Sequence, residues 1–209
     1  MQLIQFLASL ATLIAACVAV YGIFKWRAEH RGAKQIDLAE ETLELFYRAV
    51  DALASIRNPG SFSHETEGVE QAENERAEDF EARRRASIVF KRFQHEQETF
   101  SRIHALRYRF MAVFGKDSIK PFDEIFAIVW EIKRSAMSLG RLWARQRFAT
   151  EEQEAAHRKE VDKYEAIFWS GLPDDPLEAR ISDCIKDIER RCRHIVEYGV
   201  TYRSDAGDA

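Results

Sequence analysis

Residues 121–143 read PFDEIFAIVWEIKRSAMSLGRLW, and their apolar side chains recur at intervals of three and four positions. This spacing places them on one face of an α-helix, whereas a strand would alternate with a period of two. The stripe comprises Phe122, Ile125, Val129, Ile132, Ala136, Leu139 and Trp143. Phe126, Trp130 and Met137 widen the apolar face, so we expect a helix over 121–148 to be the most buried of all.

Two segments that precede this stripe are also predicted to be helices. Residues 35–56 carry apolar side chains at alternating steps of three and four, and Asn58-Pro59-Gly60 ends the run. Residues 79–114 form one long amphipathic stretch, and Gly115 suits the position after its last turn. The segment between them, 61–78, is acidic and poor in apolar residues, so we expect a mobile loop or a frayed helix start. It would serve as a solvated linker or, alternatively, as an acidic docking segment.

Two more helices are predicted after the stripe. Thr150 and Gln153 form a capping box that opens a helix over 150–169, whose first half is almost wholly polar. Asp175 caps the last helix, which has Pro176 in its first turn and extends to about residue 200. Residues 201–209 are expected to form a disordered tail.

The N-terminus of the chain is strongly apolar. Residues 1–24 contain no charged side chain, and Leu3 to Phe24 supply a run long enough for a helix across a bilayer, which needs about 20 residues. We therefore predict an all-α protein. It has one N-terminal transmembrane helix (1–27, with a basic flank to 34), followed by a cytoplasmic antiparallel bundle of about five helices over 35–200.

Two other interpretations of this run are weighed against a retained span. A cleaved secretory signal would need a basic start, a shorter apolar core and a small-residue cleavage site, and residues 1–24 hold no Lys or Arg. The residues Ile14-Ala15-Ala16-Cys17 resemble a bacterial lipobox, which would place a lipid on Cys17. The chain stays apolar after Cys17, however, which favours a span.

The residues that flank the run predict its orientation. Lys and Arg beside a span stay on the cytoplasmic side, and aromatic rings favour the interface. We therefore expect a single-pass protein of a bacterial inner membrane, with its N-terminus outside and its C-terminus in the cytoplasm. The expected membrane-interface residues are Tyr21, Lys25, Trp26, Arg27, Arg31 and Lys34.

Charge and cysteine content narrow the function classes. The net charge is −4, and because residues 25–34 carry +3, the remainder of the chain carries −7. A general nucleic-acid binder would show a basic face, so no nucleic-acid partner is expected. The chain has three cysteines without paired spacing, which predicts no disulfide framework in a cytoplasmic domain.

One pair of residues has the spacing of a metal-binding motif. Glu154 and His157 form an E-x-x-H, and di-iron bundles place two such motifs face to face. The chain has one, and it lies in a polar stretch that no apolar stripe would bury. We therefore predict a surface pair, no metal site and no cofactor.

Arg57 and His64 are spaced as R-x6-H. This spacing resembles the nuclease motif of HEPN domains, which are also helical bundles. The resemblance covers two residues and implies a nuclease site at a helix start that stacks against its dimer mate. In this chain the pair straddles the predicted turn at Asn58-Pro59-Gly60.

The densest basic run is Arg83-Arg84-Arg85, with Lys91 and Arg92 near it, and it follows the acidic segment directly. Neutralising that segment is one interpretation of the run, and binding an anionic lipid or nucleic acid is another.

No catalytic set, phosphate loop or nucleophile motif is present in the sequence. We therefore expect a structural or protein-interaction module at the lipid bilayer, acting as a homo-oligomer or with a cytoplasmic protein partner. The alternatives are a membrane-tethered enzyme or toxic effector, HEPN-like or metal-dependent, and a protein that binds anionic lipid.

Overall fold

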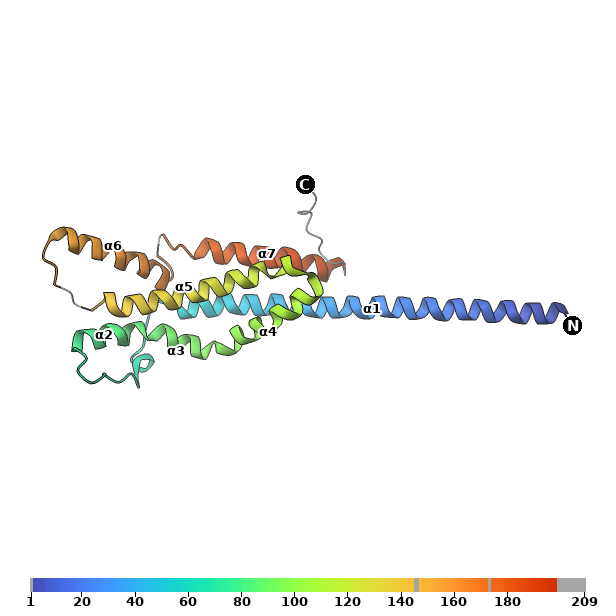
Figure 1. Ribbon diagram of the computed structural model, residues 1–209, viewed down its shortest axis with the longest axis horizontal. Coiled ribbons are helices and arrows are strands. Elements are labelled where there is room, and N and C mark those ends of the chain that lie inside the picture. The colour runs from blue at the N-terminus through green and yellow to red at the C-terminus, as the bar shows by residue number, and fades with distance from the viewer. Residues whose placement is uncertain (1, 145–146, 173, 199–209) are drawn as a thin grey trace. The chain divides into compact units, whose positions relative to one another are not determined.

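The computed structural model describes residues 2–144, 147–172 and 174–198, without the side chains of residues 2–12 and of position 63. Every regular element in those ranges is a helix, which confirms the all-α prediction (Figure 1). The expected tail, residues 201–209, lies outside the described residues. The chain divides into two units, one over residues 42–190 and one that combines 1–41 with 191–209.

The helices follow one another with short connections. Their bounds are α1 Gln2–Ile56, η1 Ser63–Thr66, α2 Ala77–Ala86, α3 Ile88–His95, α4 Gln97–Phe114, η2 Lys116–Ile119, α5 Lys120–Leu142, α6 Glu151–Phe168 and α7 Glu178–Tyr198. The apolar N-terminal segment and the predicted helix over 35–56 thus belong to one continuous helix, α1. Gly115, with φ of 87°, ends α4 in the backbone conformation that favours glycine.

The core of the 42–190 unit is built around α5. Phe122, Ile125, Ile128, Ile132 and Leu139 are fully buried on it. The Phe122 ring meets Phe46 of α1 edge-on with centroids 4.9 Å apart, and it lies 5.3 Å from Phe110 of α4. In Figure 1, α2, α3 and α4 follow one another along one side of α5, with α6 on the other side. The helical-bundle prediction is confirmed.

The long helix predicted over 79–114 is divided into α2, α3 and α4. The first break is at Ser87, whose hydroxyl donates to the carbonyl of Arg84 at 2.7 Å. Such side-chain bonds to the preceding turn compete with the helical backbone and bend it. The second break is at Glu96, whose φ of −92° and ψ of 7° leave the helical region. These breaks let the three short helices follow α5.

The prediction that Trp130 and Met137 widen the buried face of α5 is wrong. Trp130 is 61% exposed and Met137 is 47% exposed, although the rest of the predicted stripe is mostly buried. The position of these residues around the axis of α5 explains the error. Measured about that axis, Trp130 and Met137 lie within about 40° of Phe126. Phe126 contacts His104 at the edge of the contact between α4 and α5, and beyond that edge the side chains meet solvent.

In the other unit, residues 13–31 of α1 are exposed throughout, and burial begins around Leu38 and Ala39. Cys192 and Ile195 of α7 are also buried. Across the residues described with their side chains, no helix is both long and apolar enough to cross a membrane. Residues 1–12, the first part of the predicted span, lie outside that set, and the span stays a prediction.

Candidate functional site

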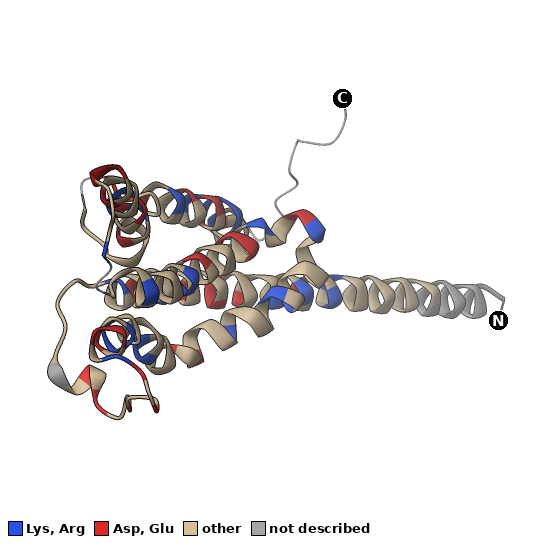
Figure 2. Ribbon diagram, turned by 60° about the vertical axis from the view of Figure 1, so that its left-hand side comes forward, with Lys and Arg blue, Asp and Glu red and all other residues tan. Residues whose placement is uncertain are grey.

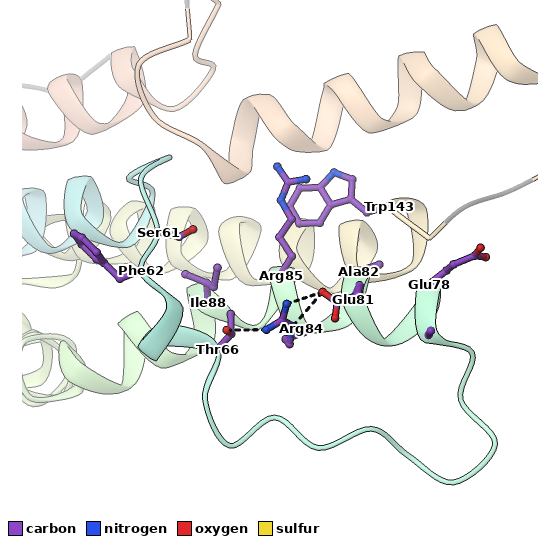
Figure 3. Close-up of a pocket in the computed structure, with 11 residues that line it drawn as sticks. Ser61, Phe62, Thr66, Glu78, Glu81, Ala82, Arg84, Arg85, Ile88 and Trp143 are labelled. Carbon is purple, nitrogen blue, oxygen red and sulfur yellow. Dashed lines mark hydrogen bonds and ion pairs between the residues drawn. The ribbon is translucent and has the colours of Figure 1, made fainter.

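A cavity of about 730 Å³ opens beside α2 in the 42–190 unit. Figure 3 shows it between the segment after α1, the α2 helix and Trp143 at the end of α5. The lining combines apolar groups with charged groups. It comprises Ser61, Phe62, Thr66, Ala77, Glu78, Glu81, Ala82, Arg84, Arg85, Ile88 and Trp143. Two residues of the predicted basic run, Arg84 and Arg85, are therefore part of this site.

The three consecutive arginines of α2 have different surroundings, because successive helical side chains point about 100° apart. Arg83 makes a two-pronged ion pair with Glu75, at 2.8 and 2.7 Å, and also donates to the carbonyl of Glu70. Arg84 donates to Glu81 at 2.7 Å and to the Thr66 hydroxyl at 3.2 Å.

Arg85 has an aromatic neighbour instead of a carboxylate. Its guanidinium carbon lies 4.2 Å from the centroid of the Trp143 ring, a cation–π distance. Within the described residues, Arg85 makes neither a hydrogen bond nor an ion pair. The Trp143 ring is itself held in place, because its Nε1 donates to Glu165 of α6 at 2.6 Å.

The acidic segment 61–78 is attached to α2 and α3 by these contacts and by a second arginine cluster. Arg92 of α3 pairs with Glu65 at 2.6 and 3.0 Å. It also donates to the carbonyls of Ile56, Asn58 and Gly60, where α1 ends and the chain turns. The mobile loop expected from composition is thus anchored at several points.

The arginine contacts change the acidity of two carboxyls. Hydrogen bonds from Arg92 lower the pKa of Glu65 from 4.5 to about 2, with partial opposition from burial and further support from the Phe62 N–H. Hydrogen bonds from Arg83, followed by one from the Ala72 N–H, lower the pKa of Glu75 to about 2. Both carboxyls are therefore ionised at neutral pH, and each can neutralise its arginine.

Arg57 lies at the end of α1, and its side chain is buried in an ion pair with Asp175 at 2.8 Å. The same guanidinium donates to the carbonyls of Ala166, Ile167 and Trp169, which close α6. The Arg57 carbonyl in turn accepts the Ser170 N–H at 2.8 Å. These contacts give Arg57 a structural role where α1, α6 and the start of α7 meet.

His64, the other half of the predicted R-x6-H pair, lies on η1 and stacks on Phe62 with ring centroids 5.7 Å apart. It lines a second cavity, of about 470 Å³, together with Glu65, Lys91, Arg92 and others. Arg57 is not part of that lining. The HEPN-like alternative stays a prediction, and the structure assigns the two residues to different surroundings.

Glu154 and His157 lie on α6. Glu154 is exposed and pairs with Arg158 one turn later, at 2.9 Å. The His157 ring lies 4.9 Å from that of Phe148. Among the described residues, no group of three or more His, Cys, Asp or Glu side chains is placed to hold a metal ion.

The predicted membrane-interface residues lie along α1 and are exposed. Lys25 approaches Glu29 one turn away at 4.0 Å, and the Trp26 ring stacks on His30 with centroids 5.6 Å apart. These are contacts within one helix, and they leave the interface assignment as a prediction.

Sequence reasoning missed two residues that organise this region. The stripe over 121–148 predicts that Trp143 lies on an apolar face, but it does not indicate that the ring supports Arg85 at the edge of the cavity. Arg92 was visible as part of the basic region that begins at Arg83, but its anchoring role was not, because most of its partners are backbone carbonyls far away in the sequence. Comparison with protein-family models, with curated proteins and with solved structures finds no match for this chain.

Proposed function

We propose that this protein is a helical bundle attached to a bacterial inner membrane by the apolar part of α1, and that it works as a protein-interaction module on the cytoplasmic side. The observation that carries the proposal is the exposure of this apolar segment. Between Leu13 and Phe24, each large apolar side chain is 51% to 69% exposed.

The exposed apolar side chains surround the helix axis. With a step of about 100° per residue, Leu13, Ile14, Val18 and Ile23 point in different directions. The remaining sector holds only small residues, such as Ala15 and Ala19. A helix that covered one protein surface would be apolar on one side only, and a helix that is apolar all round suits lipid. The charged residues from Lys25 onward then favour a cytoplasmic bundle.

The interaction surface that we propose is the outer face of α5, formed by Trp130, Arg134, Met137 and Arg141. These residues recur at steps of four, three and four, so they form one stripe. Trp130 and Met137 supply exposed apolar area of the kind that is enriched at interfaces. Arg134 and Arg141 are exposed, with no ion pair or hydrogen bond in the described part of the chain.

This combination fits one kind of partner, which is an amphipathic helix with an apolar face and acidic flanks from a cytoplasmic protein. The apolar side chains would supply most of the affinity, whereas the arginines would steer an acidic surface and select against a basic one. A second copy of this chain and a bare anionic bilayer are the outcomes that the experiment must separate from this partner.

Membrane attachment is tested by extraction of cell membranes with alkaline carbonate. We expect the full-length chain to stay in the membrane pellet and a variant with Ile14→Arg and Val18→Arg to become soluble. Each arginine at the centre of a span costs about 2.5–3.5 kcal/mol. The control variant carries Ala105→Arg at an exposed position of α4, and it should stay in the membrane pellet. Extraction of the unmodified chain by carbonate would refute the anchor.

The interaction face is tested by placing a photocrosslinking amino acid at position 130 or 137 in intact cells, with position 160 on α6 as the exposed control. We expect one adduct of the same mass from both test positions, and its loss when Arg134→Glu and Arg141→Glu are added. An adduct that contains only a second copy of this chain, crosslinks to lipid alone, or an adduct that charge reversal leaves unchanged would contradict the proposed partner.

A further inference from the structure

We propose that the cavity beside Trp143 is a binding site for a small monocarboxylate with an apolar body, and that Arg85 is its carboxylate receptor. The proposal concerns a different surface from the outer face of α5, so it does not depend on the proposed interaction role.

The first argument is the state of Arg85. Its neighbours Arg83 and Arg84 are matched by the carboxylates of Glu75 and Glu81. Arg85 has no such partner among the described residues, and its guanidinium lies against the Trp143 ring at 4.2 Å. A guanidinium held over a ring by a cation–π contact makes no hydrogen bond through that contact, so its N–H donors stay available. Those donors match the two oxygens of a carboxylate.

The second argument is that the receptor is held in position before any ligand binds. The Trp143 indole donates to Glu165 at 2.6 Å and meets the Phe168 ring edge-on with centroids 5.2 Å apart. It also stacks on Trp169 at 6.4 Å. Contact with a ring held from three sides restricts the exposed Arg85 side chain, so less conformational entropy is lost on binding than for an unsupported arginine. In Figure 3 the Arg85 side chain points to Trp143, away from the Arg84–Glu81 pair.

The third argument concerns the body and the charge of the ligand. Ala77, Ala82 and Ile88 provide apolar lining, and a volume of about 730 Å³ falls within the usual range for small-molecule sites. The lining also contains the carboxylates of Glu78 and Glu81. Arg84 pairs with Glu81, so Glu78 is the lining carboxylate without an ion pair in the described part of the chain. Because a fixed negative charge repels a dianion more than a monoanion, the site favours a carboxylate over a phosphate monoester.

The test uses 3-phenylpropionate as the probe and the full-length protein in lipid nanodiscs, with fluorotryptophan at its four tryptophan positions. Fluorine NMR then gives one signal for each ring, and Trp143→Phe assigns the signal of interest. We expect 3-phenylpropionate to shift the Trp143 signal saturably at millimolar concentrations, with the signals of Trp26 and Trp130 unchanged. The matching alcohol and amine, 3-phenylpropanol and 3-phenylpropylamine, should bind at least roughly tenfold more weakly, because they lack the charge-assisted hydrogen bonds.

Variants identify the receptor. Arg85→Gln should weaken binding of 3-phenylpropionate roughly tenfold to a hundredfold, and Arg85→Lys should weaken it less, because a point charge replaces a planar fork. Arg48→Gln removes an exposed arginine of α1 that lies outside the cavity lining, and it should leave the affinity unchanged. Thermal melts that match the unmodified protein show that each variant is folded. The proposal is overturned by no saturable shift, by equal binding of the alcohol or the phosphate ester, or by unchanged affinity in a folded Arg85→Gln protein.

Discussion

Substitution of Arg57 by methionine should be one of the most damaging single changes to the 42–190 unit. Arg57 and Asp175 are only 3% and 4% exposed at their side chains, so Asp175 would be left as a buried charge without its partner. Removing one partner of a buried ion pair costs about 3–5 kcal/mol. The carbonyls that end α6 would also lose their donor. A loss of this size is a large part of the roughly 5–15 kcal/mol that stabilises most proteins.

The measurement is urea unfolding of the full-length chain in mild detergent, followed by circular dichroism. Arg48→Met is the matched control. Arg48 lies on α1, which ends one residue before Arg57, and it pairs with Glu44 at 2.7 Å, but both side chains are more than half exposed. An exposed pair of this spacing contributes only about 0.3–0.5 kcal/mol. Arg57→Met should therefore lower the unfolding midpoint far more than Arg48→Met, with the same slope against urea.

A double variant tests whether the loss of stability comes from leaving Asp175 as an unpaired buried charge. Arg57→Met with Asp175→Leu removes both charges, and such apolar replacements of a buried pair are often close to neutral. The double variant should therefore lose less free energy of unfolding than the two single variants lose together, by at least about 1 kcal/mol. If Arg57→Met costs no more than Arg48→Met, or if the two single effects are additive, the assignment of Arg57 as a buried structural anchor is wrong.

Three other outcomes are expected. Because the pKa of Glu65 is lowered from 4.5 to about 2 by Arg92, its stabilising contribution is complete above pH 4.5 and is lost as the pH falls toward 2. Glu65→Gln should therefore be less stable than the unmodified chain at neutral pH, and the difference between their urea midpoints should shrink on acidification. Burial raises the pKa of the Cys184 and Cys192 thiols to about 12, so mass spectrometry should find neither alkylated by iodoacetamide at neutral pH until the protein unfolds. A Cβ at Gly140 would lie 3.4 Å from the nearest atom of α2, so Gly140→Ala should raise stability by up to about 1 kcal/mol through helix propensity. Thermal melts measure both Gly140 variants. In these melts, Gly140→Leu should lower stability by about 1–3 kcal/mol because its larger side chain would push α2 away.

Local signals in the sequence were sufficient to predict helices and several of their ends. They did not predict the short helices η1 and η2, and α5 ends at Leu142, before the predicted end at 148. The stop after α4 follows from a glycine that adopts a positive φ, and the start of α6 follows from Thr150, whose side chain accepts the Gln153 N–H at 3.3 Å. The breaks at Ser87 and Glu96 carry neither proline nor glycine. They depend on packing along α5, and no periodicity of three and four residues could indicate them.

The candidate site was less accessible to sequence reasoning, for a physical reason. The run of three arginines was visible, but which of them lacks a carboxylate depends on where the loop that precedes α2 lies. Glu75 is close to Arg83 in the sequence, whereas the Trp143 ring that supports Arg85 comes from a helix more than 50 positions later. The exposure of Trp130 could not be predicted from the sequence either, because it depends on how far α4 extends across the surface of α5.

The position of Arg57 also has a consequence for biosynthesis. Its partners lie 109 to 118 positions further along the chain. A ribosome must therefore translate beyond residue 175 before the end of α1 can acquire its buried partners, and all of α5 and α6 is made in that interval. Contacts of this range close late in folding, because a long loop must first be ordered. During synthesis the apolar face of α5 is without its final cover. This interval is when the nascent protein is most exposed to aggregation and to chaperone binding.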